Sequence, residues 1–557
     1  GPSFNEIPPN QTITLGDSIS IQINITEPSG LDSWADNDTD SFDVNDSGYF
    51  NNTADLSVGT YYVNISATDQ DQNVGAFTFQ VTVTQAGDAT INVNTCAGLK
   101  TAINDSNATI NITGSFNCAG TAFNNWDDTN VSEFNYSFHG NNYTISNLTI
   151  VNTRSSATLY TGLIPKFSTG EFKDIIFDNL TITSASQTGG LFGDVFDSNI
   201  SNVIVQGKIT HTSTHPNTGG IASTSNKSIL RNVTFNGTIV SDDNSNGGLI
   251  GRTLPSSFMT NIVNSYVYVD INSSNSNNNN IGGFVGNSYS TNISHVYGNV
   301  VIKSFGVDQG GVLGRVRGTS HINNVNISVY LNNSGGAAND GSGGLVGAQD
   351  NNIILIISNS TVTGTIIGND FQGGLIGIAK NNLFLNTSSF IGDMTTGKES
   401  GGIIGEASSN GTVFKVYAKG NLTGSFQLGG LVGDMFNLKL NNSYAHMNIT
   451  SNYTAGDPII GGLVGNFQSG TLKNNYYVGN ITNDTNAYVG AVIGKFTSGT
   501  YSNNFYDNQT TIINGGIGNA TQPNASANAI GKNTADMRTR STFTTANWDF
   551  TSNWLMN

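Results

Sequence analysis

The sequence predicts an all-β protein: a parallel, right-handed β-helix solenoid preceded by a small antiparallel β-sandwich. A glycine-rich motif returns about every thirty residues, which is the period of a solenoid. Short clusters of β-branched and aromatic residues lie between turn residues along the chain, a pattern typical of strands. Paired glycines at that period disfavour helix, because glycine in a helix interior costs about 1 kcal/mol.

Residues 1–87 predict the sandwich, because alternating runs such as GTYYVNISATD and GAFTFQVTVTQ are separated by Gly, Asp and Asn turns. The stretch VNISATDQDQNVGAFTFQVTV resembles the last two strands of immunoglobulin-like or cadherin-like modules. That resemblance implies a Ca²⁺ site at Asp69 and Asp71, since cadherin-like modules hold the ion between carboxylates. The alternative is a polar hairpin turn. Ca²⁺ is the one cofactor that the sequence suggests.

Residues 88–160 predict the N-terminal cap and first coils of the β-helix. They contain both cysteines of the chain, Cys96 and Cys118. We expect these to form one disulfide, with two buried thiols as the alternative. The segment FHGNNYTISNLTI resembles the usual entry into the first coils of such solenoids.

Residues 161–520 predict the repeat array. Each glycine motif is followed by a segment that begins apolar and then alternates, such as ISHVYGNVVI or LNNSYAHMNIT. We expect the central apolar residues of the motif to point into the core, and its glycines to supply positive-φ corners. The motif starts at Gly189, Gly247, Gly282, Gly310, Gly343, Gly373, Gly401, Gly429 and Gly461.

One tyrosine position recurs in these repeats and predicts an aromatic ladder. Equivalent residues of stacked coils lie about 4.8 Å apart, so their rings would stack from coil to coil. The ladder residues are Tyr266, Tyr297, Tyr417, Tyr444 and Tyr476, with Phe505 in the last repeat.

GGLVG followed by NNSYAHMNIT is similar to the GLUG repeat of bacterial and archaeal adhesin-like surface proteins. The similarity covers about residues 160–510, and it implies a β-helix at a cell surface. Residues 521–557 resemble the segment that closes these arrays. We expect Trp548 and Phe550 to cover the last coil, because an uncapped repeat exposes its core and strand edges.

The chain is acidic and sparsely charged, with 21 Lys+Arg, 38 Asp+Glu and a formal net charge of −17. Nucleic acid is therefore not an expected partner, because no basic stripe is present to displace counterions from phosphates. The sequence also has no apolar run long enough to span a membrane.

The sequence offers little catalytic chemistry, and we expect no enzyme activity. The densest acidic group of the array is Asp174, Asp178, Asp194 and Asp197, and we expect a solvated rim there. His211 and His215 lie in a loop-like segment without a third metal ligand. A polysaccharide-degrading β-helix is the enzyme alternative, and it would need carboxylates clustered on adjacent coils.

About thirty-four Asn-X-Ser/Thr sequons occur, roughly twice the number that chance would supply. This excess predicts an exported, N-glycosylated protein, and with scarce cysteine and few charges it favours an archaeal surface glycoprotein. Part of the excess also suits turns that run into strands. The candidate glycosylation sites are Asn10, Asn24, Asn64, Asn142, Asn147, Asn232, Asn236, Asn326, Asn421, Asn448, Asn452, Asn480 and Asn508.

These features predict an extracellular structural glycoprotein at the cell surface, a subunit of a self-assembling filament, sheath or S-layer. Without a spanning helix, we expect contacts between copies of the chain to hold it in place. Phe4, Ile7 and Ile13 belong to an extended N-terminus that could add a strand to a neighbour's sheet edge. The alternative is a monomeric surface adhesin that binds glycans or partner cells through its exposed Asn and Thr faces.

Overall fold

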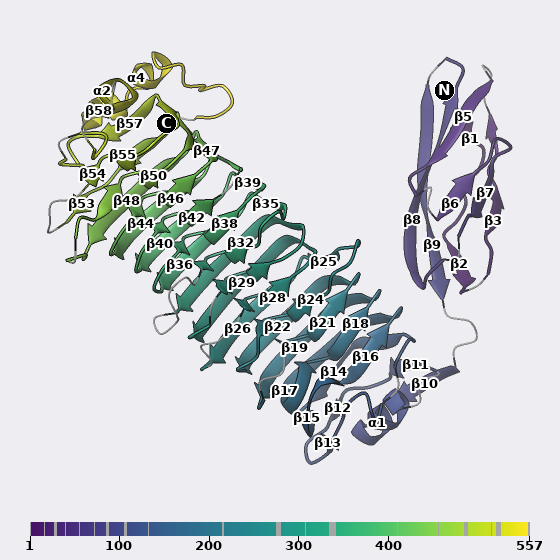
Figure 1. Cartoon of the computed structure of the whole chain (residues 1–557). Coiled ribbons are helices and arrows are strands. Elements are labelled where there is room, and N and C mark those ends of the chain that lie inside the picture. Colours follow the sequence, from purple (N-terminus) through teal and green to yellow (C-terminus); the bar gives the residue numbers. More distant parts are fainter. Residues whose placement is uncertain are drawn as a thin grey trace.

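The computed structural model describes the chain except for residues 1, 16, 27–29, 39–40, 55, 72, 85–88, 105–107, 132, 214–216, 275–279, 307, 334–340, 409, 455, 484–487, 514, 520–524 and 555–557. It is an all-β protein, in which a long parallel β-helix follows a small N-terminal sandwich (Figure 1). The predicted fold class is confirmed.

The sandwich consists of a four-stranded sheet in the order β2-β9-β8-β5, a three-stranded sheet in the order β3-β7-β6, and the pair β1-β4. All of its pairs are antiparallel except β2-β9, which is parallel. Side chains alternate along β8 and β9, and their inward-facing half forms an apolar core with Phe42 and Phe50. The strands are β1 (Ser3–Phe4), β2 (Gln11–Thr14), β3 (Ser20–Gln22), β4 (Ile25–Thr26), β5 (Leu31–Asp36), β6 (Phe42–Val44), β7 (Tyr49–Asn52), β8 (Gly59–Asp69) and β9 (Val74–Thr84).

The first turns of the solenoid carry helix α1 (Cys96–Asn104), which buries Leu99, Ala102 and Ile103 against the apolar core. Helix α1 lies at the end of the stack where β10 and β11 begin it (Figure 1). The first strands are β10 (Ala89–Val93), β11 (Ala108–Ile112), β12 (Phe116–Asn117), β13 (Ala122–Asn124), β14 (Phe138–Ser146) and β15 (Thr149–Thr161).

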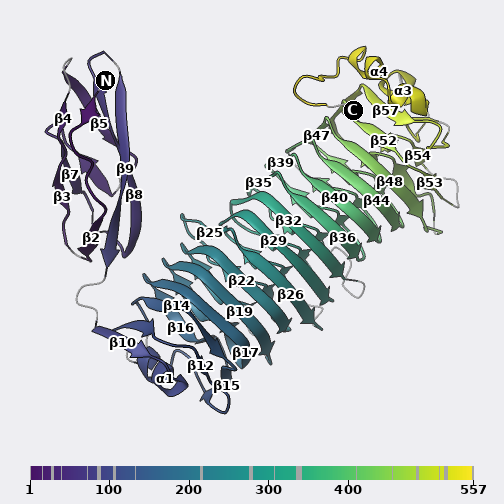
Figure 2. The same cartoon turned by 180° about the vertical axis from the view of Figure 1, so that it is seen from behind.

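One face of every repeat coil belongs to a twelve-stranded parallel sheet, in which each strand pairs with its equivalent in the next coil. Figure 2 shows the same regular stack from behind. The strands of this sheet are β16 (Ile164–Ser168), β18 (Phe192–Phe196), β21 (Ala222–Asn226), β24 (Ile250–Thr253), β28 (Val285–Ser288), β31 (Leu313–Val316), β34 (Val346–Gln349), β38 (Ile376–Lys380), β42 (Ile404–Ser408), β46 (Val432–Phe436), β50 (Val464–Phe467) and β55 (Ile493–Phe496).

The remaining strands continue the long sheet that begins with β10, and they wrap the other faces of the coils. They are β17 (Glu171–Gly189), β19 (Asn199–His211), β20 (Thr218–Gly219), β22 (Ile229–Val240), β23 (Ser245–Gly247), β25 (Thr260–Val263), β26 (Tyr266–Ser273), β27 (Asn280–Gly282), β29 (Thr291–Ser304), β30 (Asp308–Gly310), β32 (Ser320–Asn332), β33 (Ser342–Gly343), β35 (Leu355–Ser358), β36 (Thr361–Ile367), β37 (Gln372–Gly373), β39 (Leu383–Asn386), β40 (Ser389–Thr395), β41 (Ser400–Gly401), β43 (Thr412–Phe414), β44 (Tyr417–Gly424), β45 (Leu428–Gly429), β47 (Leu438–Asn441), β48 (Tyr444–Ser451), β49 (Ile459–Gly461), β51 (Gly470–Lys473), β52 (Tyr476–Val478), β53 (Ile481–Thr482), β54 (Tyr488–Gly490), β56 (Thr500–Ser502), β57 (Asn504–Asp507) and β58 (Ala529–Lys532).

The glycine motif forms the corner between the two sheets, and motif stacks on motif. Gly282 pairs with Gly310 in the long sheet, and Val285 pairs with Leu313 in the twelve-stranded sheet. The central apolar residues are fully buried, as predicted; Phe284 is an example. Their burial joins successive coils into one continuous apolar core.

The motif glycines do lie at the corners, but the prediction that they are needed there for a positive φ is wrong. None of them has a positive φ; the left-handed corners belong instead to residues such as Asn179, Asn202 and Asn232. The glycines are needed because the backbone passes too close for a side chain. A Cβ at Gly247 would lie 1.8 Å from the carbonyl oxygen of Ile250. Asparagine tolerates the left-handed region better than other residues that carry a Cβ, so it takes the corners.

The tyrosine ladder forms in two parts. Tyr266 stacks on Tyr297 with ring centroids 5.7 Å apart. Tyr417, Tyr444 and Tyr476 form the second part, with centroids 5.0 and 4.9 Å apart and nearly parallel rings. Between the two parts the same register is occupied by Asn326, Thr361 and Ser389, so the ladder is interrupted.

A compact cap follows the last coils. It contains α2 (Ala525–Asn528), α3 (Thr534–Met537) and α4 (Arg540–Thr544), and it gathers at the C-terminal end of the stack (Figure 1). Phe505, Phe543 and Trp548 form a separate buried cluster, and Phe550 packs at its margin. Trp548 and Phe550 therefore lie where a covering of the apolar end requires them.

Candidate functional site

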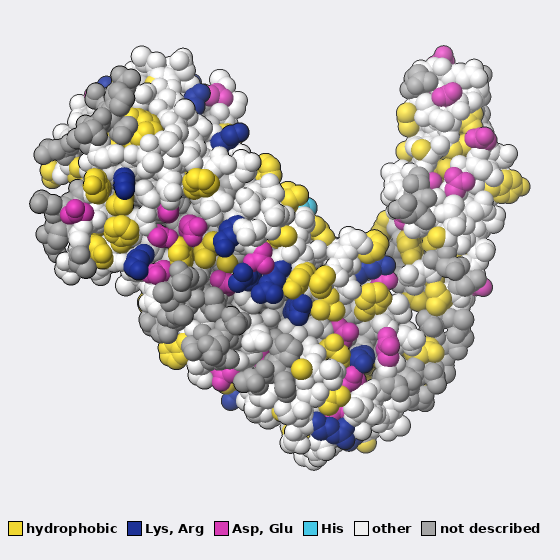
Figure 3. Space-filling view, viewed as in Figure 1, with side chains coloured by type: hydrophobic (Ala, Val, Ile, Leu, Met, Phe, Trp, Pro, Cys, Tyr) yellow, Lys and Arg dark blue, Asp and Glu magenta, His cyan; other side chains and the backbone are white. Residues whose placement is uncertain are grey.

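The sequon asparagines lie on the surface. All of the candidate glycosylation sites are exposed except Asn147, which is half-buried. They occur on the sandwich, for example Asn10 and Asn64, and along the solenoid up to Asn508. Uncharged side chains dominate the face seen in Figure 3, with few charged groups between them. The candidate asparagines are therefore accessible on both the sandwich and the solenoid.

Some of these asparagines also bind the neighbouring coil. Asn421 Nδ2 donates to Asp393 Oδ1 at 2.7 Å, and Asn448 Nδ2 donates to Asn421 Oδ1 at 3.0 Å. These two hydrogen bonds form an asparagine ladder from coil to coil. Similar ladders join Asn147 to Asn117 and Asn232 to Asn202. An N-linked glycan is attached to this same nitrogen, so the sequons divide into those that build ladders and those that do not.

The carboxylate of Asp69 is buried, and it accepts hydrogen bonds from the backbone N–H of Asn73 and from Asn73 Nδ2. The hydrogen bond from the Asn73 side chain lowers the pKa of Asp69. Asp71 is exposed in the same turn. The described part of the chain contains no group of three or more His, Cys, Asp or Glu side chains that could hold a metal ion. The Ca²⁺ site stays a prediction.

Cys96 and Cys118 are joined by a disulfide. Both residues are buried in the main core, and the bond ties the start of α1 to the turn after β12. It therefore lies in the N-terminal cap, where coils have a neighbour on one side only.

The N-terminal residues expected to mediate assembly are part of the sandwich itself. Phe4 in β1 packs against Trp34 and Phe77, with ring centroids 6.2 and 4.6 Å away. Ile13 in β2 packs against the sandwich core, whereas Ile7 is 58% exposed. Strand addition to a neighbour would therefore exchange contacts that the segment makes within its own chain.

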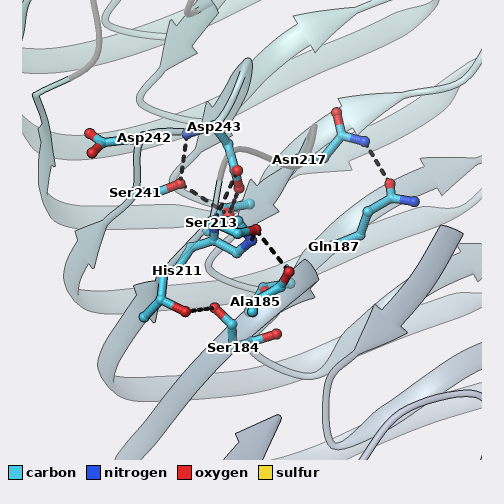
Figure 4. Close-up of polar contacts among 12 residues, drawn as sticks. Ser184, Ala185, Gln187, His211, Ser213, Asn217, Ser241, Asp242 and Asp243 are labelled. Atoms are coloured by element: carbon cyan, nitrogen blue, oxygen red, sulfur yellow. Dashed lines mark hydrogen bonds and ion pairs between the residues drawn. The ribbon is translucent and has the colours of Figure 1, made fainter. Parts of the chain in front are cut away.

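A polar cluster, unforeseen in the sequence, fills one corner of the solenoid. The side chains of His211 and Asp243 are fully buried, and His211 Nδ1 lies 2.9 Å from Asp243 Oδ1 (Figure 4). Thr218 Oγ1 donates a hydrogen bond to Asp243 Oδ2. Burial raises the pKa of Asp243, and the interactions with His211 and Thr218 oppose that rise. Asp242 points away from this pair and binds Ser274. His215 and Pro216 lie outside the described residues.

The cluster has the atoms of a Ser-His-Asp arrangement, since Ser213 Oγ lies 3.4 Å from His211 Nε2. The hydroxyl of Ser213, however, donates to the carbonyl oxygen of Ala185 at 2.8 Å. Its proton is thus directed away from the imidazole, whereas a nucleophile must donate to the base. The geometry is that of a hydrogen-bonded core network linking adjacent coils.

Several carboxylates of other coils are partly or fully buried, and burial raises their pKa values. Asp308 is bound by Arg315 at 3.0 Å, and burial raises the pKa of Asp308 to about 6. Burial, and then the charges of Asp434 and Glu406, raise the pKa of Glu399 to about 7. Burial also raises the pKa of Asp434 to about 6. Glu406 and Asp434 occupy the same register in β42 and β46, so like charges face each other across adjacent coils.

The acidic group near the first coils does not converge into a site. Asp174 accepts a hydrogen bond from Asn202, Asp194 accepts one from Thr224, and Asp197 forms an ion pair with Lys227 at 2.8 Å. These three carboxylates are thus used in contacts with the next coil, whereas Asp178 is exposed.

Two pockets of comparable size lie on the solenoid. One, of about 500 Å³, is lined by His211, Asp242, Lys303 and Phe305 among other residues of successive coils. The other, of about 510 Å³, lies between the last coils and the C-terminal cap and is rich in aromatic residues. No helix of the described residues is long and apolar enough to cross a membrane.

Comparison with protein-family models and with curated proteins finds no match. Among solved structures, the chain is similar to a protein titled IgA1 Protease, with a TM-score of 0.34 and 17% sequence identity. The similarity covers 69% of this chain and 29% of that one. The chain therefore spans less than a third of the structure that it matches.

Proposed function

We propose that this protein is an extracellular structural glycoprotein, a subunit of a self-assembling structure at the cell surface. The observation that carries the proposal is the exposure of the sequon asparagines on both the sandwich and the solenoid. An exported chain would carry N-linked glycans at such positions. The likeness of its repeats to those of GLUG surface proteins supports the same proposal.

The solenoid suits a structural role because its coils share one apolar core from the first turns to the last. Helix α1 lies at one end and the aromatic cap at the other, and such caps oppose direct stacking of one solenoid on the next. Contacts between copies would then use other surfaces. The sandwich offers them, since β5, β3 and β6 are edge strands.

The N-terminal segment is the candidate connector. Its strand β1 forms only two residue pairs with β4, and β2 forms four with β9. Another copy of the same segment can make identical contacts, which is why exchange of an element between protomers costs little. Exchange would place Phe4 of one copy against the Phe77 and Trp34 positions of the next.

Negative-stain microscopy of native material tests the proposal. We expect filaments, sheets or a lattice, and isolated rods would contradict the assembly. Phe4→Ala should reduce assembly, because it removes the ring that packs on Phe77. Tyr62→Ala is the matched control, since Tyr62 is 65% exposed on the same sandwich. Equal assembly of the two variants would show that the N-terminal segment does not connect one copy of the chain to the next.

A further inference from the structure

The pocket between the last coils and the C-terminal cap is a concave site. The cap could cover the apolar end of the last coil without forming it. Phe505, Phe543 and Trp548 already bury the apolar end. The pocket next to them has a volume of about 510 Å³, within the usual range of small-molecule sites of about 300–1,000 Å³. Its walls come from strands β48, β52 and β57 and from the cap. We propose that this pocket binds a pyranose ring of a carbohydrate.

Aromatic faces supply the apolar side of the pocket. Trp554 stacks on Trp548 with ring centroids 4.5 Å apart and lies 5.6 Å from the ring of Tyr476. Trp548 is buried, whereas Trp554 and Tyr476 are partly exposed. The C–H faces of a pyranose are apolar and leave water favourably against a flat ring, while its hydroxyls point outward from the ring edge. Indole offers a large rigid face for this contact.

The polar groups of the pocket match the hydroxyls of a sugar, each of which both donates and accepts. Asp507 supplies the acceptor, and its carboxylate is oriented by three hydrogen bonds. They come from Thr534 Oγ1 at 2.7 Å, from the N–H of Gln509 at 2.9 Å and from the N–H of Thr510 at 3.3 Å. An ionised carboxylate accepts about four hydrogen bonds, so it retains capacity for a ligand. Arg538 supplies donors: it is exposed, and it forms no ion pair with any described residue.

The chain holds the aromatic platform in place by a contact outside the pocket. Lys415 Nζ donates to the carbonyl oxygen of Ser552 at 2.7 Å, which ties the C-terminal segment to β43–β44. Trp554 lies two residues further and reaches the rings of Tyr444 and Tyr476. The second part of the tyrosine ladder thus ends beneath Trp554. The aromatic surface of Trp554 and Tyr476 is in place before any ligand binds.

The sugar has two sources with the same chemistry. It belongs either to an N-linked glycan of another copy of this chain or to an unrelated polysaccharide at the cell surface. The inference goes beyond the proposed structural function and does not depend on it, because a chain that never assembles would still bind free oligosaccharide.

The test uses the full chain and oligosaccharides of glucose, mannose, galactose and N-acetylglucosamine, with calorimetry and tryptophan fluorescence as readouts. We expect saturable binding by at least one of them. Trp554→Ala and Arg538→Ala should each weaken it by about ten-fold or more, as loss of a central contact does. Phe384→Ala is the control, because Phe384 is 51% exposed on β39, outside the pocket, and should leave binding unchanged.

Binding that both pocket variants leave intact overturns the inference, and so does the absence of binding to every free oligosaccharide and to the glycosylated copy of the chain. If Trp554→Ala lowers the melting temperature of the cap, the result for Arg538→Ala decides whether the pocket binds the sugar. The Arg538 side chain is exposed, so its removal should not disturb the packing of the cap. A second arm presents glycosylated and enzymatically deglycosylated copies of the protein. Binding of the glycosylated copy alone assigns the source to its own glycans, and binding of free oligosaccharides alone assigns it to other polysaccharides.

Discussion

At the scale of single residues, the sequon asparagines separate into two groups. Asn421 and Asn448 donate through Nδ2 to the coil before them. Asn236 and Asn326 are equally exposed, and their side chains donate to no described residue. We predict low glycan occupancy at the first pair and high occupancy at the second, because the glycan takes the nitrogen that builds the ladder. Mass spectrometry of glycopeptides from native protein measures both, and equal occupancy would contradict the prediction.

The same scale shows what could not be predicted from the sequence. His211 and Asp243 are one coil apart, and their contact depends on a register that only the stacked structure sets. The motif glycines were recognisable as essential positions, but a sequence does not show whether a glycine is needed for its φ or for lack of space. At Gly247 the reason is space, because a neighbouring carbonyl oxygen occupies the position of a Cβ.

At the scale of elements, the repeats were predictable because each coil has the same apolar positions and the same corner. The stacked pair Tyr444 and Tyr476 follows directly from that alignment. The helices were not foreseen, since α1 and α3 occur once each, in caps outside the repeat. A cap has to cover apolar surface and strand edges, and many local structures meet that requirement.

The corner itself is testable by a glycine substitution. Gly247→Ala would place a methyl group 1.8 Å from a carbonyl oxygen inside a stacked coil. We expect it to lower the free energy of unfolding by about 3 kcal/mol or more, since a backbone cannot yield as a side chain does. Thermal unfolding measures it. Gly114→Ala is the control, because a Cβ there meets its nearest atom at 3.9 Å, and a comparable loss in that variant would contradict the explanation.

The disulfide belongs to the N-terminal cap as an element. Cys96 and Cys118 are separated by 22 residues and link α1 to the first coils. Replacing both by serine should lower the stability of this cap by about 2–4 kcal/mol, because the unfolded segment gains conformational freedom. Hydrogen exchange should show faster exchange in α1 and unchanged exchange in the central coils. Uniformly faster exchange along the solenoid would instead make the bond a determinant of the whole array.

At the scale of the whole molecule, the net charge of −17 is uneven: residues 1–87 contain twelve Asp and Glu and no Lys or Arg, which leaves −5 on the rest of the chain. The coils nevertheless place equivalent residues one above another. The register that stacks tyrosines also stacks carboxylates, as at Glu406 and Asp434. Burial, and then repulsion between like charges in adjacent coils, raises the pKa of Glu399 to about 7 and that of Asp434 to about 6. Protonation of these groups relieves the repulsion.

The pH dependence of stability follows from these shifts. The pKa of Glu399 is higher in the folded chain than its ordinary value, so the folded state binds a proton between pH 4.5 and about 7 that the unfolded state does not. Its stabilisation is full below pH 4.5 and is lost as the pH rises through about 7. Because Glu399 is partly exposed, solvent screening limits the gain to about 1–2 kcal/mol.

We therefore predict that the solenoid unfolds at a higher temperature at pH 5 than at pH 8. Below about pH 4 the trend reverses, because carboxylates of lowered pKa, such as Glu171 beside His139 and Lys173, lose their partners on protonation. Calorimetry at pH 3, 5 and 8 measures the curve. Glu399→Gln should reduce the difference in unfolding temperature between pH 5 and pH 8. Glu6→Gln, at an exposed carboxylate of the sandwich, should leave that difference unchanged. A stability that rises from pH 5 to pH 8 would show that the stacked carboxylates do not govern this range.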